Sequence, residues 1–588
     1  MRLLQQFPGA LAAAHDPSTF SDLLSQRGIK SPAGTGASVY FCSICMQYGR
    51  GFARGGLLLV IWGSLVFGQH ALYLIHFQKK PDSLLPYVET YLSPKAIERR
   101  RLQEIPIDEH DLPVPAEWVS ELCKSGRVIS VSRWLNAALI EVDSPHDLPQ
   151  APFIRCIEPF FRGNPSSSFS LRLPTTAAHA VFEEFTNGGA SVTDQQLSML
   201  RLPDLHQQNL YGRGVRIAIF DAGFPGMNQI PGFQHVFAQG RFIAGYDFVS
   251  GDSIVFDDNA HGTMVASVIL GRDSTTGYLG GAPEAEAILA RTENALSETR
   301  HEEWNWARAV EWADSLGAQI IQSSLGYSTF DDPNENYTYS DMNGRTAITT
   351  QAARIAAQKG LLVVTSAGNE GASPWRYITA PADADSVLAV GAVDATGQIA
   401  SFSSRGPTAD GRIKPEVVAM GQGTRMLRPD GNVGSGSGTS FAAPLITSLA
   451  ACLWQARPAL HAQLLRKVII ESADRYSNPD TAYGYGLPNG AQALARLTAL
   501  PQSSPSPAPR LFPNPTTDNL SLFLPDTSLG WYSLTICDES GRLIFSTIYR
   551  GLTLLTLPAA TWRPGIYWLH LTHQQNPKQT FRSAFIKL

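Results

Sequence analysis

Apolar residues in the middle of the chain follow two spacings. Short, nearly continuous apolar runs predict buried strands, which we place at 215–221, 318–324, 361–365 and 387–390. Apolar side chains at helical spacing predict helices over 306–316 and 348–358. Because strands and helices alternate, we expect residues 195–498 to form an α/β domain with a doubly wound parallel sheet and helices on both of its faces.

Shorter patterned segments precede this domain. Strand-like runs at 72–77, 127–132 and 137–142 accompany a charged helical stretch near 96–101. They predict a small α+β domain over residues 72–160. The following segment, 161–194, is rich in Ser, Thr and Gly and has no clear periodicity, which is typical of a linker.

The C-terminal part of the chain has a different pattern. Residues 499–509 are rich in Pro and Ser, a composition that predicts a second linker. Residues 510–588 alternate short strands with turn signals at 538–541 and 564–565. They predict a small β-sandwich.

One strongly apolar segment lies near the N-terminus. Residues 57–67 are apolar and follow Arg50 and Arg54. This apolar segment is shorter than the roughly 20 residues that a helix needs to span a bilayer. This pattern predicts a signal peptide at 46–68, with a membrane anchor as the weaker alternative. Since a signal begins near the start of translation, we expect synthesis to start at Met46 and residues 1–45 to be spurious or disordered.

Composition and charge exclude several classes of partner. The 588 residues include 46 basic and 51 acidic side chains, which gives no basic footprint for nucleic acid or for a membrane surface.

The six cysteines are too scattered for a disulfide framework. Cys123 could pair with Cys156, but unpaired thiols are the favoured interpretation. Cys42 and Cys45 have metal-ligand spacing, yet no second pair follows, so we expect a chance match.

Three short segments carry residues suited to nucleophilic catalysis. Asp221 ends an apolar strand, His261 precedes a glycine and an apolar helical segment, and Ser440 follows the glycine-rich run 436–439. A serine hydroxyl is a weak nucleophile unless an imidazole removes its proton and a carboxylate orients that imidazole. Each residue alone has an ordinary structural interpretation, but their joint occurrence favours catalysis.

The order Asp221, His261, Ser440, with the segments around each residue, resembles the subtilisin-like serine peptidases (subtilase family). The resemblance implies that Asn369, in the segment 366–371, contributes to the oxyanion hole together with the backbone N–H of Ser440. It also implies that Ser324, Leu325 and Gly326 bind substrate backbone and line the specificity pocket. Ala222 stands where many members of the family have a small hydroxyl residue, and we expect this difference to affect packing rather than chemistry.

The flanking domains carry resemblances of their own. The position of residues 72–160 is similar to that of the propeptide in secreted subtilases, and a permanently attached accessory domain is the alternative. The run 512–515, the turn at Gly541, the segment 565–567 and Lys587 resemble the C-terminal sorting domain of the type IX secretion system in Bacteroidetes. The alternative for this domain is a binding sandwich that stays on the mature protein.

Together these features predict a secreted or cell-surface serine endopeptidase, exported through the periplasm and acting as a monomer on protein or peptide substrates. The expected partners are those substrates and the type IX secretion machinery, with no nucleic acid and no stable membrane span. No cofactor is expected to be required; calcium could bind a surface loop, but no residues are assigned to it. The alternative function is an inactive peptide-binding protein or adhesin on the same fold.

Overall fold

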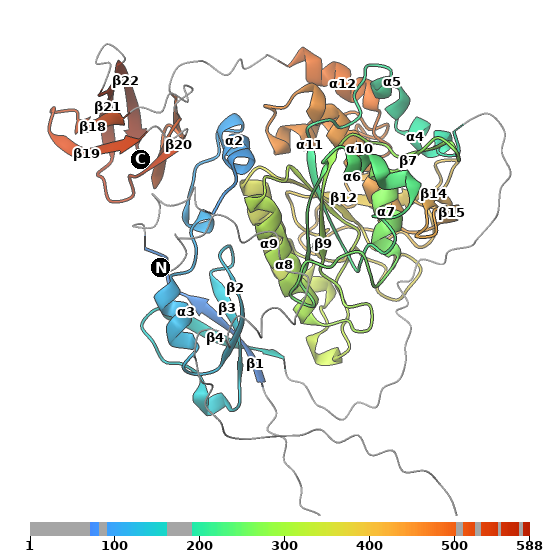
Figure 1. Cartoon of the computed structure of the whole chain (residues 1–588), viewed down its shortest axis with the longest axis horizontal. Coiled ribbons are helices and arrows are strands. Elements are labelled where there is room, and N and C mark those ends of the chain that lie inside the picture. Colours follow the sequence, from blue (N-terminus) through green and yellow to red (C-terminus); the bar gives the residue numbers. More distant parts are fainter. Residues whose placement is uncertain are drawn as a thin grey trace, which may run out of the picture. The chain divides into compact units, whose positions relative to one another are not determined.

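We describe a computed structural model of the chain, which covers residues 71–81, 91–161, 191–500, 510–523, 531–550, 554–574 and 580–588. The predictions for residues 1–45, for the signal peptide at 46–68, and for nearly all of the two linkers lie outside these described residues. Figure 1 shows the arrangement of the helices and strands.

The N-terminal domain is an antiparallel sheet with helices, as the α+β prediction requires. Its strand order is β2-β3-β1-β4. Three strands and one helix agree with the predicted segments, whereas α3 and β4 were not predicted. The elements are β1 (Ala71–Phe77), α2 (Pro94–Leu102), α3 (Ala116–Leu122), β2 (Arg127–Ser132), β3 (Ala137–Val142) and β4 (Ile154–Phe161).

The central domain, residues 191–500, contains a seven-stranded sheet with the order β13-β12-β11-β10-β5-β9-β6. Every neighbouring pair in this sheet is parallel, which confirms the predicted α/β class. Its strands are β5 (Arg216–Asp221), β6 (Phe242–Asp247), β9 (Glu286–Arg291), β10 (Ile320–Ser323), β11 (Leu362–Ser366), β12 (Leu388–Val393) and β13 (Val417–Met420). Short hairpins are formed by β7 (Arg272–Asp273) with β8 (Tyr278–Leu279) and by β14 (Thr424–Leu427) with β15 (Val433–Gly436).

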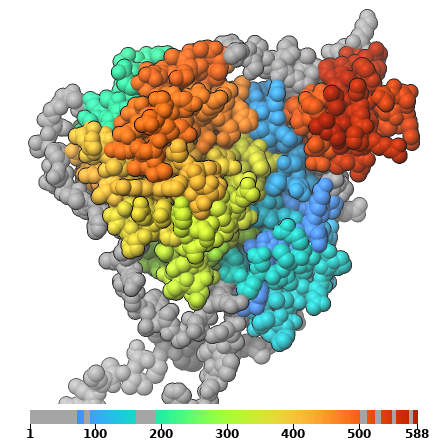
Figure 2. Space-filling view, turned by 180° about the vertical axis from the view of Figure 1, so that it is seen from behind, coloured from blue at the N-terminus to red at the C-terminus, as the bar shows by residue number. Residues whose placement is uncertain are grey.

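Helices cover both faces of this sheet because successive side chains of a strand point to opposite sides. In β5, Ile217 and Ile219 join one hydrophobic cluster, and Ala218 and Phe220 join another. The first cluster includes residues of α4 (Asp194–Met199), α5 (Leu202–His206), α6 (Gln234–Ala238), α7 (His261–Leu270), α10 (Thr439–Ala456), α11 (Ala462–Glu471) and α12 (Gly490–Ala499). The second includes residues of α8 (Arg300–Ser315) and α9 (Ile348–Gln358). Figure 2 shows the segment of α11 and α12 in orange.

The N-terminal domain contacts the central domain through a buried ionic network on α8. Asp314 of α8 accepts hydrogen bonds from Arg99 and from Arg100, the latter at 2.8 Å, and from Arg133 at 3.1 Å. Arg100 also pairs with Asp111, whose other oxygen accepts from Lys359 at 2.6 Å. Burial alone would raise the pKa of Asp314, but the arginines outweigh it and lower this pKa to about 2. The domain interface is therefore held by ionised groups.

The C-terminal domain is built from two antiparallel sheets, as predicted for a β-sandwich. One has the order β16-β17-β20 and the other β19-β18-β21-β22. Leu520 and Leu522 of the first sheet share a hydrophobic cluster with Leu534 and Leu569 of the second. The strands are β16 (Arg510–Phe512), β17 (Asn519–Phe523), β18 (Trp531–Asp538), β19 (Leu543–Arg550), β20 (Leu554–Pro558), β21 (Gly565–His573) and β22 (Thr580–Lys587).

Two smaller predictions concern cysteines and membrane spans. Cys123 and Cys156 are both free thiols, so the pairing considered for them does not form. Within the described ranges, no helix is long and apolar enough to cross a bilayer.

Candidate active site

Three neighbouring parallel strands end at the same edge of the central sheet. β5 ends at Asp221, Ser324 directly follows β10, and Asn369 lies three residues beyond the end of β11. In open α/β sheets, ligands bind outside the carboxyl ends of the strands. The sheet therefore brings one residue from each of three predicted site segments to the edge where a ligand is expected.

Asp221 and His261 form a direct pair at this edge. His261 is the first residue of α7, and its Nδ1 lies 2.9 Å and 3.0 Å from the two carboxylate oxygens of Asp221. Asp221 is fully buried, whereas the side chain of His261 is 23% exposed. The Nδ1 edge of the imidazole is thus held by a carboxylate, while part of the side chain remains exposed.

A glycine makes this approach of α7 to β5 feasible. A Cβ atom on Gly262 would lie 2.3 Å from the carbonyl oxygen of Gly223 and 2.9 Å from the Cβ of Asp221. Neither atom could move without shifting the backbone that carries Asp221. The glycine after His261 is therefore required for the close packing of α7 against β5 that forms this pair.

The charge of Asp221 changes the acid–base behaviour of His261. Burial alone would lower the pKa of His261, but the negative charge of Asp221 and its hydrogen bond outweigh burial and raise this pKa above 6.5. The carboxylate stabilises the imidazolium form, which is the form that appears when a histidine takes a proton from a nucleophile.

Ser440 lies in the first turn of α10, and the residue that follows it contacts the imidazole. The ring of Phe441, the following residue, has its centroid 5.6 Å from that of His261. The Ser440 hydroxyl donates to the carbonyl oxygen of Ser324 at 3.3 Å. Hydrogen bonds of catalytic groups are often incomplete in the absence of substrate. A rotation of the hydroxyl away from Ser324 is needed before it can donate to His261.

Ser324 also stabilises the start of α10 in a way the sequence did not predict. Pro444 has no backbone N–H, so the carbonyl of Ser440, four residues earlier, lacks its intrahelical partner. The hydroxyl of Ser324 donates to that carbonyl at 2.7 Å. Ser324 and Ser440 therefore exchange two hydrogen bonds, which fixes the backbone of the candidate nucleophile. Pro444 within an apolar helix was the available signal, but its partner could not be identified from the sequence.

Asn369 reaches the same helix start. Its Oδ1 accepts from the backbone N–H and from the hydroxyl of Thr439, at 2.9 Å in both cases. The oxygen end of the amide is thereby fixed, and its NH₂ group is left to donate elsewhere. The contribution of Thr439 was not predicted, because in the sequence this residue is only the last of the glycine-rich run 436–439.

The predicted substrate-binding segment becomes more exposed with distance from β10. Ser324 is buried, Leu325 is half-buried and Gly326 is exposed. A Cβ atom on Gly326 would lie 2.2 Å from Oγ1 of Thr379, and one on Gly368 would lie 3.0 Å from the same atom. This hydroxyl is buried without a hydrogen-bond partner among the described residues. Thr379 thus lies between two glycines at the candidate site, a position that the sequence analysis did not identify.

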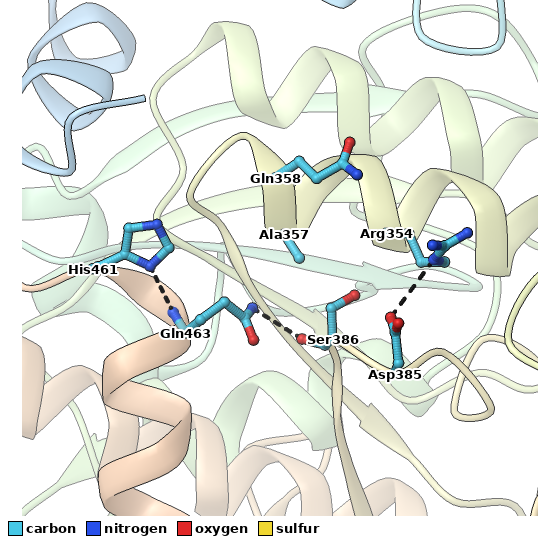
Figure 3. A pocket seen from close by; sticks show the side chains of 7 residues that line it. All are labelled: Arg354, Ala357, Gln358, Asp385, Ser386, His461 and Gln463. Atoms are coloured by element: carbon cyan, nitrogen blue, oxygen red, sulfur yellow. Dashed lines mark hydrogen bonds and ion pairs between the residues drawn. The ribbon is translucent and has the colours of Figure 1, made fainter. Parts of the chain in front are cut away.

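A separate cavity of about 440 Å³ contains none of the predicted site residues (Figure 3). Asp385 and Ser386 precede β12, and Ala357 and Gln358 precede β11, which places the cavity where these strands begin. It is therefore at the edge of the sheet opposite to the candidate active site.

The fold and the site together define an α/β protein with a candidate Asp-His-Ser catalytic site at the carboxyl edge of its parallel sheet. Residues 212–486 match the family model described as "Subtilase family". Residues 72–168 match "Peptidase S8 propeptide domain, Bacteroidota", and residues 510–587 match "Secretion system C-terminal sorting domain".

The chain is also similar to several known proteins. The chain is 31% identical to subtilisin DY from Bacillus licheniformis over 294 residues, which is 50% of this chain and 95% of that protein. It is 32% identical to subtilisin E from Bacillus subtilis over 308 residues, or 51% of this chain and 70% of that protein. Among solved structures, it is similar to MycP1 from Mycobacterium smegmatis, with 25% identity, a TM-score of 0.42, and coverage of 54% of this chain and 88% of that one.

The chain belongs to the subtilase family. It is a secreted serine endopeptidase with a propeptide domain and a C-terminal sorting domain. The family membership supports this function over the inactive peptide-binding protein that the sequence had left open.

Proposed function

We propose that the protein cleaves peptide bonds through an acyl-enzyme formed on Ser440. His261 takes the hydroxyl proton of Ser440 on Nε2 while Oγ attacks the carbonyl carbon of the scissile bond. His261 then returns this proton to the leaving amine, and a water molecule releases the acyl group by the same route. Asp221 holds the imidazole with Nδ1 protonated throughout. The contact between Asp221 and His261, beside the start of α10, is the observation that carries this assignment.

In this proposal, Asn369 stabilises the negative oxygen of the tetrahedral intermediate. Its Oδ1 is engaged by Thr439, so its NH₂ group is the end that can donate to substrate. The backbone N–H of Ser440 would act as the second donor. Such preorganised donors lower the barrier because they need no reorientation as the charge develops.

Substrates would bind as extended peptides along Ser324, Leu325 and Gly326. The exposure of Gly326, three residues beyond the end of β10, supports backbone pairing with a peptide. This mode recognises the main chain, and it fits an endopeptidase that acts on many proteins.

Maturation would follow the order of the domains. Cleavage within 161–194 would separate the propeptide domain, and the sorting domain would direct export through the periplasm by the type IX machinery. All residues of the proposed mechanism come from one chain, which supports action as a monomer.

The test is hydrolysis of casein and self-cleavage by the purified full chain, compared with Ser440→Ala. We expect the parent to cleave both itself and casein and the variant to remain intact and inactive. A Ser440→Ala variant that retained casein hydrolysis after repurification would refute the assignment of Ser440. A parent chain that is processed by added protease and yet inactive would refute the proposed mechanism as a whole.

A further inference from the structure

Strands β1 and β4 bring three potential metal ligands to one face of the N-terminal sheet. His76 of β1 lies directly opposite Cys156 of β4, and Glu158 pairs with Leu74, two residues away. Directly paired residues, and residues two positions apart on a strand, project from the same face of a sheet. The sheet therefore places an imidazole, a thiol and a carboxylate next to one another, on elements that the proposed mechanism does not use.

The distances between these donors are close to those in a tetrahedral zinc site. One donor atom from each of the three residues lies within 4.8 Å of the others. His76 Nε2 is 3.7 Å from a carboxylate oxygen of Glu158, and Cys156 Sγ is 4.0 Å from the other oxygen. Metal–ligand bonds of about 2.0 Å to N and O and about 2.3 Å to S place neighbouring ligand atoms about 3.3–3.5 Å apart. Small rotations of the side chains would close this difference.

His76 provides an independent observation. Both of its ring nitrogens are buried and lack a hydrogen-bond partner among the residues that the structure describes. Buried polar atoms of folded proteins are rarely left without a partner, and each exception calls for an explanation. A metal ion bound to Nε2, the nitrogen that faces Glu158 at 3.7 Å, would supply a partner for that one of the two nitrogens.

The other two residues are accessible to an incoming ion. Cys156 is a free, half-buried thiol, and the side chain of Glu158 is 63% exposed. Imidazole, thiolate and carboxylate are the three donor types that zinc takes from proteins. A harder ion such as Ca²⁺ or Mg²⁺ would instead require an all-oxygen set.

We propose that His76, Cys156 and Glu158 bind one Zn²⁺ ion, with water as the fourth ligand. Binding releases the thiol proton of Cys156 to solvent, because only the thiolate coordinates the metal. The ion joins β4, the edge strand that precedes the segment 161–194, to the central strand β1. This site is independent of the mechanism proposed above, and its failure would leave that mechanism intact.

The test uses the full chain with Ser440→Ala, which prevents self-cleavage, and with Cys42 and Cys45 replaced by serine, which removes the other closely spaced thiols. Titration with Co²⁺ should produce a thiolate-to-metal charge-transfer band that saturates at one equivalent and disappears when Zn²⁺ is added. Cys156→Ser should abolish this band. Cys123→Ser, which removes an exposed free thiol of the same domain, is the matched control and should leave the band unchanged.

A second variant distinguishes the loss of a metal ligand from misfolding of the domain. Glu158→Gln changes an exposed side chain and should therefore keep the circular dichroism spectrum of the parent. It should weaken Zn²⁺ binding more than about tenfold, because removing even a residue that only supports a metal ligand typically costs at least that much affinity. The proposal is overturned if the folded parent gives no charge-transfer band, if the band survives Cys156→Ser, or if Glu158→Gln binds Zn²⁺ as tightly as the parent.

Discussion

Thr439 holds Asn369 by two hydrogen bonds to the same oxygen. The backbone N–H and the hydroxyl of Thr439 both donate to Oδ1 of Asn369, and Thr439 immediately precedes Ser440. The proposed oxyanion donor and the proposed nucleophile are therefore positioned by one helix start. Any movement of α10 would displace both groups together.

This relationship predicts graded effects of two substitutions. Asn369→Ala removes a donor to the oxyanion and should lower kcat by about 10²–10³, with little change in KM. Thr439→Val removes only the hydroxyl contact, since the backbone N–H still holds Oδ1, and should lower kcat much less. Steady-state kinetics on a peptide substrate measure both. Equal losses in the two variants would contradict the assignment of Asn369 as the donor.

The pKa of His261 predicts how activity depends on pH. A general base must be neutral, and Asp221 raises the pKa of His261 above 6.5. The value of kcat/KM should therefore rise with pH through a midpoint above 6.5. Asp221→Asn removes the cause of the shift, so the midpoint should move downwards and kcat should fall by about 10⁴, as in the Ser-His-Asp template. A pH–rate profile of each form measures this. An unchanged midpoint in Asp221→Asn would contradict the account.

The buried ionic network predicts a strong contribution of Asp314 to the stability of the precursor. Removing one partner of a buried ion pair typically costs about 3–5 kcal/mol. In the Ser440→Ala background, Asp314→Asn should lower the free energy of unfolding by an amount of this order. Glu121→Gln removes an exposed pair with Lys124 and should cost less than about 1 kcal/mol. Denaturant unfolding of both variants provides the comparison.

The same network predicts resistance to mild acid. The pKa of Asp314 in the folded state is about 2, below its ordinary value of 3.8, so its contribution is fully present above pH 3.8 and is lost only as the pH falls towards 2. The stability difference between the parent and Asp314→Asn should therefore be equal at pH 5 and pH 7. A difference that disappears already at pH 5 would contradict this description of the interface.

Thr379 is expected to influence cleavage specificity. Its buried hydroxyl lies against both Gly326 and Gly368, next to the segment proposed to bind substrate. Thr379→Gly should enlarge this space and shift the preferred residue before the scissile bond towards larger side chains, by about tenfold in relative kcat/KM. Thr379→Ser keeps the hydroxyl and should shift the preference less. Cleavage profiles of a peptide library measure the change, and identical profiles for all three forms would exclude this role.

The sequence predicted those features that depend on local pattern. Apolar runs predicted the four buried strands β5, β10, β11 and β12, and helical spacing predicted the helix α9. These predictions agree with the structure because the side chains of these elements are buried at regular intervals along the chain. β4 was missed because it is an edge strand that contains Pro159 and polar residues. α3 was missed because only seven residues form it, too few to establish a period.

Contacts between distant segments were not accessible from the sequence. Nothing in the local pattern around Ser324 indicates that its hydroxyl bonds to the carbonyl of Ser440, which lies 116 residues away. Asp314 likewise occupies an ordinary helical position, and its three arginine partners belong to another domain. Such pairings depend on how domains and strand ends meet, which propensity and periodicity do not encode.

The most direct test of the proposed mechanism is covalent labelling of the processed enzyme with a fluorophosphonate, followed by mapping of the labelled peptide by mass spectrometry. We predict a single adduct on Ser440, absent in Ser440→Ala and strongly slowed in His261→Ala. An adduct on another serine, or a folded and processed enzyme that takes up no label, would contradict the activation of Ser440 by His261.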